Sequence, residues 1–253
     1  MASSRPNKPS SKRSSSTAGK KTPKVAPAEA AALEASSSQD WLTTEDGDYC
    51  TGFVFRYFSA GKRGERVETK PKAEARQAEE IIMQRVAHAL KYRPDWMETL
   101  CCLDNGVEVR LYQGQGFKDE DLEIYLFGRT TVHGDDVILE FATDEVINGG
   151  RDIHDDVMDV VIHELVHLID YLDDEDGVLP DWTADEGLLF WEQREHEWEL
   201  LRNEKPTPLV PYALTNEVEF LAVLGEVFFM RSEELKAHNP ILFNLMHKFF
   251  YPA

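Results

Sequence analysis

The chain has 253 residues, carries a formal net charge of −20 and is 42% hydrophobic. This length suits one domain of up to about 200 residues or two small domains, and we expect one. The apolar runs fall short of the roughly 18 residues that a transmembrane helix needs, and an acidic body repels nucleic acid and anionic membranes. We therefore expect neither a membrane span nor a nucleic-acid or membrane partner.

The first 39 residues differ in composition from the rest. They are largely Ser, Lys, Pro and Ala, lack aromatic residues and Ile, and carry a net charge of +5, which leaves −25 for the remainder. Such a segment cannot bury enough apolar surface to offset the entropy of ordering. We predict a disordered tail over residues 1–39 and one domain over residues 40–253. An organelle transit peptide stays open as the alternative to a plain solvated tail.

Three cysteines occur, Cys50 and the adjacent Cys101 and Cys102, and they form no CxxC pair. They are too few for a disulfide framework and wrongly spaced for a structural zinc site. Reduced, packed thiols are the default interpretation, and they are consistent with an intracellular compartment. We expect a cytoplasmic protein.

The first regular elements are predicted between residues 73 and 141. Ile81, Val86 and Leu90 lie along a helical stripe in residues 73–92, which predicts an α-helix that Pro94 ends. Three short apolar runs follow, separated by glycines and an acidic pair: Val107–Tyr112, Leu122–Phe127 and Val137–Phe141. We expect these runs to form a small sheet ahead of the next helix.

The segment Asp155–Leu172, DDVMDVVIHELVHLIDYL, contains the motif HELVH. On an α-helix, positions four apart lie about 40° apart around the axis, so His163 and His167 point the same way from successive turns. Neutral imidazoles suit zinc, and three protein ligands leave a fourth position for water. Glu164 leans towards that position, where it could take a proton from water attacking a carbonyl. The spacing therefore predicts a ligand, a base and a second ligand.

The same helix has a simpler interpretation. Its apolar residues recur at helical intervals and give it a face to bury, and Asp155 and Asp156 supply acidic groups for its start. Because HExxH also arises by chance, the alternative is an ordinary helix whose histidines are satisfied by hydrogen bonds.

The next helix is predicted from a capping box. Thr183 is followed three residues later by Glu186, and the helix that they begin should run to about Asn203. Prolines then break the chain into an extended connection.

A final apolar helix is predicted over Glu217–Met230, EVEFLAVLGEVFFM. Glu219 and Glu226 lie on one side of it, because seven residues return to within about 20° of the same direction. Burying two glutamates on an apolar helix costs free energy unless a positively charged group pairs with them, and a metal ion would be such a group.

Two histidines need a third ligand, and four residues are of a suitable type: Asp170, His196, Glu219 and Glu226. Asp170 follows His167 by only one helical turn, so its short side chain suits a supporting role, accepting a hydrogen bond or fixing the helix end. We expect His196 to be exposed because its neighbours are charged. Glu219 is the predicted ligand, and Glu226 is predicted to support a histidine from behind.

Several of these stretches together resemble one known family. HELVHLID, DGVLPDW, EFLAVLGEVFF and HNPILFNLMHKFF are similar to the Mlc titration factor A family of zinc-dependent peptidases, whose catalytic domain resembles that of anthrax lethal factor. The likeness covers roughly residues 134–251 well and residues 70–133 loosely. It implies an α+β, zincin-like domain in which a small sheet is followed by the HExxH helix and further helices.

The resemblance also implies roles for particular residues. His163 and His167 would bind zinc, one ion per chain, with Glu219 as the third ligand. Glu164 would be the general base. Tyr212, seven residues before Glu219 as in the family, would donate a hydrogen bond to the oxyanion of the tetrahedral intermediate.

Two positions depart from the family pattern. Gly225 stands where the family usually has a serine, and Asp159 stands where an asparagine is expected. Neither position is a predicted ligand.

We therefore predict a zinc metallopeptidase that acts on peptides or proteins. One alternative is a zinc-binding module without catalysis that sequesters a protein partner such as a transcription regulator. Another is a helical protein with a purely structural role and no metal. In zinc peptidases the edge of the small sheet offers a strand on which an extended substrate can add.

Overall fold

The computed structural model describes residues 52–60, 66–118, 125–134, 136–149, 159–173 and 176–252. The predicted tail over residues 1–39 and the first residues of the predicted metal helix, 155–158, lie outside these ranges.

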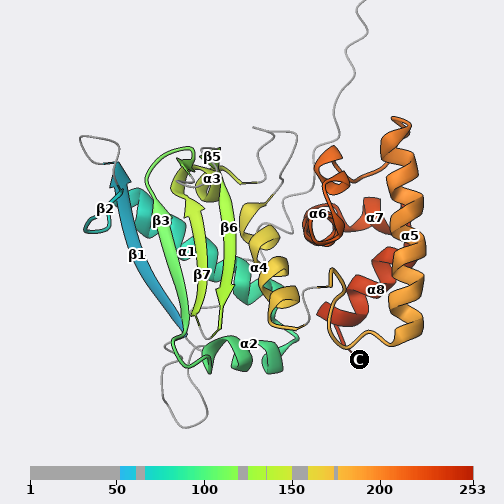
Figure 1. Ribbon diagram of the computed structural model, residues 1–253, viewed down its shortest axis with the longest axis horizontal. Coiled ribbons are helices and arrows are strands. Elements are labelled where there is room, and N and C mark those ends of the chain that lie inside the picture. The colour runs from blue at the N-terminus through green and yellow to red at the C-terminus, as the bar shows by residue number, and fades with distance from the viewer. Residues whose placement is uncertain are drawn as a thin grey trace, which may run out of the picture. The chain divides into compact units, whose positions relative to one another are not determined.

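A five-stranded sheet occupies the first half of the described chain (Figure 1). Its strand order is β2-β1-β3-β7-β6, with parallel pairs at the centre (β1 with β3, β3 with β7) and antiparallel pairs at both edges. The strands are β1 (Phe53–Ala60), β2 (Arg66–Glu68), β3 (Val107–Tyr112), β6 (Gly128–His133) and β7 (Asp136–Ala142). A separate two-stranded pair is formed by β4 (Phe117–Lys118) and β5 (Tyr125–Leu126).

Alternation along the central strands separates the two faces of the sheet. Val107, Val109 and Leu111 of β3 are buried, and the same alternation buries Val137 and Leu139 of β7. These side chains share one hydrophobic core with the apolar faces of α1 (Ala73–Ala89) and α4 (Val160–Tyr171). The sheet thus presents one apolar face to the helices, and α4 lies beside the edge strand β6.

The second half of the described chain is helical (Figure 1). The remaining helices are α2 (Pro94–Cys101), α3 (Thr143–Asn148), α5 (Ala184–Arg202), the 3-10 turn η2 (Pro211–Leu214), α6 (Glu217–Met230), α7 (Ser232–His238) and α8 (Pro240–Phe250). α6 is the most enclosed of them, because every residue from Phe220 to Phe228 is buried between α4, η2 and α8. None of the helices in the described ranges is both long and apolar enough to cross a bilayer.

Several predicted elements are confirmed. The run Val107–Tyr112 is β3, and the helix predicted over Glu217–Met230 is α6. α5 begins after Thr183, whose hydroxyl accepts from the backbone N–H of Glu186 while the Glu186 carboxylate accepts from Thr183, as the capping box predicts. A small sheet does precede the HELVH helix and contains two of the predicted runs as β3 and β7, but the described part of the run Leu122–Phe127 forms β5, which pairs with β4 outside that sheet.

Other predictions need correction. The helix predicted from Asp155 does not run continuously to Leu172, because Asp159 is extended (φ −147°, ψ 98°) and its carboxylate caps a helix that begins at Val160. Strands β1, β2 and β6 were not predicted. Cys101 is disulfide-bonded, so the expectation of reduced thiols is wrong for this residue, whereas Cys102 is a free, exposed thiol.

Candidate metal centre

Two imidazoles converge on one face of α4. His163 and His167 are buried one turn apart, with ring centroids 4.7 Å apart and their Nε2 atoms separated by 3.1 Å. Asp159 caps the N-terminus of α4 just ahead of them, since its Oδ1 accepts from the backbone N–H groups of Val161 and Ile162.

The first turn of α6 brings a carboxylate to the same point. Asn216 caps α6 by accepting from the backbone N–H of Glu219 at 2.9 Å. Glu219 Oε2 then lies 3.0 Å from His163 Nε2 and 3.3 Å from His167 Nε2. The ligand atoms of these three residues all fall within 4.8 Å of one another. Long-range packing of α6 on α4 therefore joins residues 52 or more positions apart in the chain.

The donor set and its spacing fit a zinc ion. Ligand atoms at about 2.0–2.1 Å from a tetrahedral zinc ion lie about 3.3–3.4 Å from one another, close to the observed separations. Two imidazole nitrogens and one carboxylate oxygen are ligands that zinc accepts, and three of them leave a fourth position open.

The charges of the cluster favour a cation at its centre. Burial lowers the pKa of His163, but the carboxylates of Glu219 and Glu226 outweigh burial and raise it to about 10. Burial likewise raises the pKa of Glu219, but hydrogen bonds from His163 and His167 hold it well below its ordinary range. The positive charge of protonated His163 and the negative charge of Glu219 stabilise each other. A metal ion bound at the same point would supply the positive charge in place of the proton.

Glu226 supports His163 from behind. Its side chain is fully buried, and its Oε1 lies 2.8 Å from His163 Nδ1. Its other oxygen accepts from the backbone N–H of Asp159 at 2.7 Å. A carboxylate behind a histidine fixes the tautomer and the direction of the ring, so that Nε2 faces Glu219.

The side chain of Glu164 is held against the edge strand β6. The Thr130 hydroxyl lies 2.8 Å from Glu164 Oε2, and it also lies 2.9 Å from the Glu164 carbonyl oxygen. Gly128 leaves space for the carboxylate, since a Cβ there would stand 2.5 Å from Glu164 Oε1. Burial raises the pKa of Glu164. Sequence reasoning missed Thr130 and Gly128, although the β-branched run of β6 ahead of Gly134 was a signal for this strand.

Tyr212 reaches the cluster from η2. Its ring centroid lies 5.9 Å from that of His163, and its side chain remains partly accessible. Burial, followed by the charge of Glu219 and a hydrogen bond to it, raises the pKa of the phenol well above its ordinary value. The hydroxyl therefore keeps its proton and can act as a hydrogen-bond donor. Trp198 Nε1 donates to the carbonyl of Ala213 at 2.7 Å and anchors η2 to α5.

The other two candidates lie outside the cluster. Asp170 Oδ1 accepts from the backbone N–H of Gly177 at 2.9 Å and so fixes the turn after α4. Within the described part of the chain, Asp170 Oδ2 and His167 Nδ1 are both buried and make no hydrogen bond, so these two side chains are not bonded to each other. His196 is exposed on α5.

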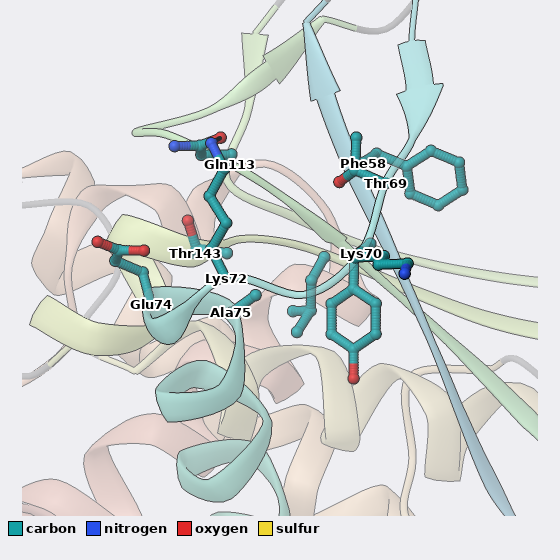
Figure 2. A pocket seen from close by; sticks show the side chains of 10 residues that line it. Phe58, Thr69, Lys70, Lys72, Glu74, Ala75, Gln113 and Thr143 are labelled. Atoms are coloured by element: carbon teal, nitrogen blue, oxygen red, sulfur yellow. Dashed lines mark hydrogen bonds between the residues drawn. The ribbon is translucent and has the colours of Figure 1, made fainter.

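A pocket lies away from this centre, at the ends of β1 and β3 (Figure 2). Lys72 and Gln113 are among its lining residues, and Lys72 Nζ donates to Gln113 Oε1 at 2.7 Å. Its lining includes none of the predicted site residues.

Comparison with known proteins decides the family. A family model described as glucose-regulated metallo-peptidase M90 matches residues 75–251. The chain belongs to this family. The resemblance to the Mlc titration factor A family is thereby confirmed. Members of this family are described as metallopeptidases.

A more distant relative adds little about activity. An uncharacterized protein of Synechocystis sp. is 25% identical over 160 residues, which amount to 61% of this chain and 57% of the relative. The match thus spans a little over half the length of this relative.

Proposed function

We propose that this chain is a zincin-like, zinc-dependent peptidase with one metal ion held by His163, His167 and Glu219. The observation that carries the proposal is the convergence of their three ligand atoms within 4.8 Å, with the buried Glu164 carboxylate in electrostatic contact with all three residues. A zinc ion there would supply Lewis-acid polarisation of the scissile carbonyl and of water.

Side chains of the protein carry out proton transfer, oxyanion stabilisation and positioning. Glu164 takes the proton of the attacking water and passes it to the leaving amine, and its raised pKa suits both steps. Tyr212 donates a hydrogen bond to the oxyanion of the tetrahedral intermediate. Glu226 and Thr130 hold His163 and Glu164 in place.

The edge strand gives the substrate a place to bind. Among the described strands, β6 pairs on one side only, with β7, and its Thr130 touches the general base. An extended peptide that adds to the other side of β6 would pass directly over Glu164.

Peptide hydrolysis by the zinc-loaded full chain tests the proposal. The substrates are fluorescein-labelled casein and a peptide mixture with free and blocked N-termini. The parent should cleave, a chelator should stop cleavage, and added zinc should restore it. Glu164→Gln should keep its zinc and lose activity at least about 100-fold, because a positioned general base contributes about that much.

The matched control is Glu192→Gln, which changes an exposed glutamate of α5 and should cleave as the parent does. Full activity of Glu164→Gln would end the assignment. Zinc bound by a parent that cleaves nothing would favour the alternative, a module that sequesters a protein partner.

A further inference from the structure

A charged pair lies beneath the start of the metal helix. Arg85 lies in the C-terminal half of α1, and its Nε is 2.7 Å from Asp159 Oδ2. The pair is largely enclosed, because the Asp159 side chain is 4% exposed and the Arg85 side chain 32%. Arg85 Nε is buried and makes no aligned hydrogen bond with any residue that the structure describes, so its contact with Asp159 is an ion pair rather than a directed bond.

Asp159 uses each of its polar groups for a different partner. Oδ1 accepts from the first N–H groups of α4, and Oδ2 meets Arg85. Its backbone N–H donates to Glu226 Oε2 at 2.7 Å. Asp159 therefore caps the helix that carries the histidines and also positions the carboxylate behind one of them.

The contacts continue to the metal centre without a gap. Glu226 Oε1 lies 2.8 Å from His163 Nδ1, and His163 Nε2 faces Glu219. Arg85, Asp159, Glu226 and His163 thus form one chain of contacts from α1 to the ligand atoms. Each of the last three is at most 5% exposed in its side chain, so solvent does little to screen the interactions.

The electrostatic need for Arg85 follows from this burial. Asp159 and Glu226 are both buried acidic residues, and the Glu226 carboxylate lies 2.7 Å from the backbone nitrogen of Asp159. Without a cation, the Asp159 carboxylate would turn towards solvent or displace its cap, because a buried unpaired charge costs several kcal/mol. Either change would move the backbone N–H of Asp159 away from the Glu226 carboxylate, which accepts a hydrogen bond from it.

We propose that Arg85 is a positioning residue of the metal centre, acting through Asp159 and Glu226 on the direction of His163. This inference rests on the proposed function only in that the cluster binds zinc. A neutral side chain at position 159 that still caps α4 would remove the need for the cation, so the two residues act as a matched pair.

The test is a double-mutant cycle read as the zinc dissociation constant of the full chain, measured in competition with a chromogenic chelator. Arg85→Met keeps the length of the side chain and removes its charge. Asp159→Asn keeps an oxygen for the cap and the backbone N–H, and asparagine is a good capping residue. Arg85→Lys restores the charge. Arg76→Met is the control, because Arg76 is an exposed arginine of the same helix that pairs with Glu79.

Arg85→Met should weaken zinc binding about tenfold, the low end of what loss of a group behind a ligand costs. The double variant Arg85→Met with Asp159→Asn should bind zinc within about threefold of the parent, and so should Arg85→Lys and Arg76→Met. A purely structural role for Arg85 in packing α1 on α4 would predict no recovery in the double variant.

Each outcome decides the inference. Parent-like zinc binding by Arg85→Met overturns it, as does a double variant that binds as weakly as Arg85→Met or fails to fold. If Arg85→Met alone fails to fold while the double variant folds and binds zinc, the pairing is supported. Failure of the parent itself to bind zinc would overturn the proposed function, and the inference with it.

Discussion

Thr130 contacts Glu164, the proposed general base, through its hydroxyl. Its hydroxyl is the side-chain group that meets Glu164 Oε2, and hydrogen bonds to charged groups are worth about 1.5–3 kcal/mol. Thr130→Val removes the hydroxyl while keeping the shape, so we expect kcat for casein-derived peptides to fall about 10- to 100-fold with little change in KM or zinc content. Thr130→Ser should retain most of kcat. An unchanged kcat in Thr130→Val would show that Glu164 does not need this partner.

Asp170 gives a dependence of stability on pH with an unusual sign. Burial raises the pKa of this carboxyl to about 6 from its ordinary 3.8, so folding favours the protonated acid. The associated stability is complete below about pH 4, is lost as pH rises towards 6, and stays lost above it.

Asp170→Asn should therefore match the parent at pH 4 and exceed it at pH 8. The gain should be about 1–3 kcal/mol in the free energy of unfolding, because the neutral amide keeps the oxygen that accepts from Gly177 and removes the buried charge. Urea unfolding of the metal-free proteins at both pH values checks this. A difference that does not grow with pH would be inconsistent with a buried, unpaired Asp170 oxygen.

At the scale of elements, the centre depends on how closely α6 approaches α4. Gly225 lies where the two helices touch, and a Cβ there would stand 2.6 Å from Val166 Cγ2. This explains why glycine replaces the serine expected at this position, since a serine would push α6 and its glutamates away from the histidines.

Gly225→Ala should lower the free energy of unfolding by about 1–3 kcal/mol, as overpacking does, and should weaken zinc binding. Adding Val166→Ala should recover part of both losses. Gly187→Ala in α5 is the control, because its Cβ would meet only Val178 Cγ1 at 4.0 Å and should add about 0.5–1 kcal/mol. Parent-like stability and zinc binding in Gly225→Ala would contradict close packing of α4 on α6.

Local patterns predicted the elements whose signals are short-range. The spacing of His163 and His167 placed both imidazoles on one face, and the capping box placed the start of α5. The strand β6 was missed because its Thr residues are neither apolar nor strictly alternating, and it gains its place by pairing with β7. The predicted start of α4 is wrong because Asp155 and Asp156 also suit a helix start, whereas Asp159 is the residue that caps the helix.

At the scale of the whole molecule, the sequence predicted a small sheet followed by helices but not how they pack. The sheet contains parallel pairs that join strands far apart in the chain, such as β1 with β3, and periodicity carries no information about such pairing. The third member of the cluster was found by residue type and family resemblance, whereas its distance from the histidines depends on packing across the core.

The most direct test of the central claim is the zinc content of the purified full chain after dialysis, compared with that of Glu219→Gln and His167→Gln. The account predicts one zinc ion per chain in the parent and a loss of at least about 100-fold in zinc affinity in each variant, because each removes one of three protein ligands. A parent that retains no zinc after loading, or variants that retain it as the parent does, would contradict the assignment of His163, His167 and Glu219 as a metal centre.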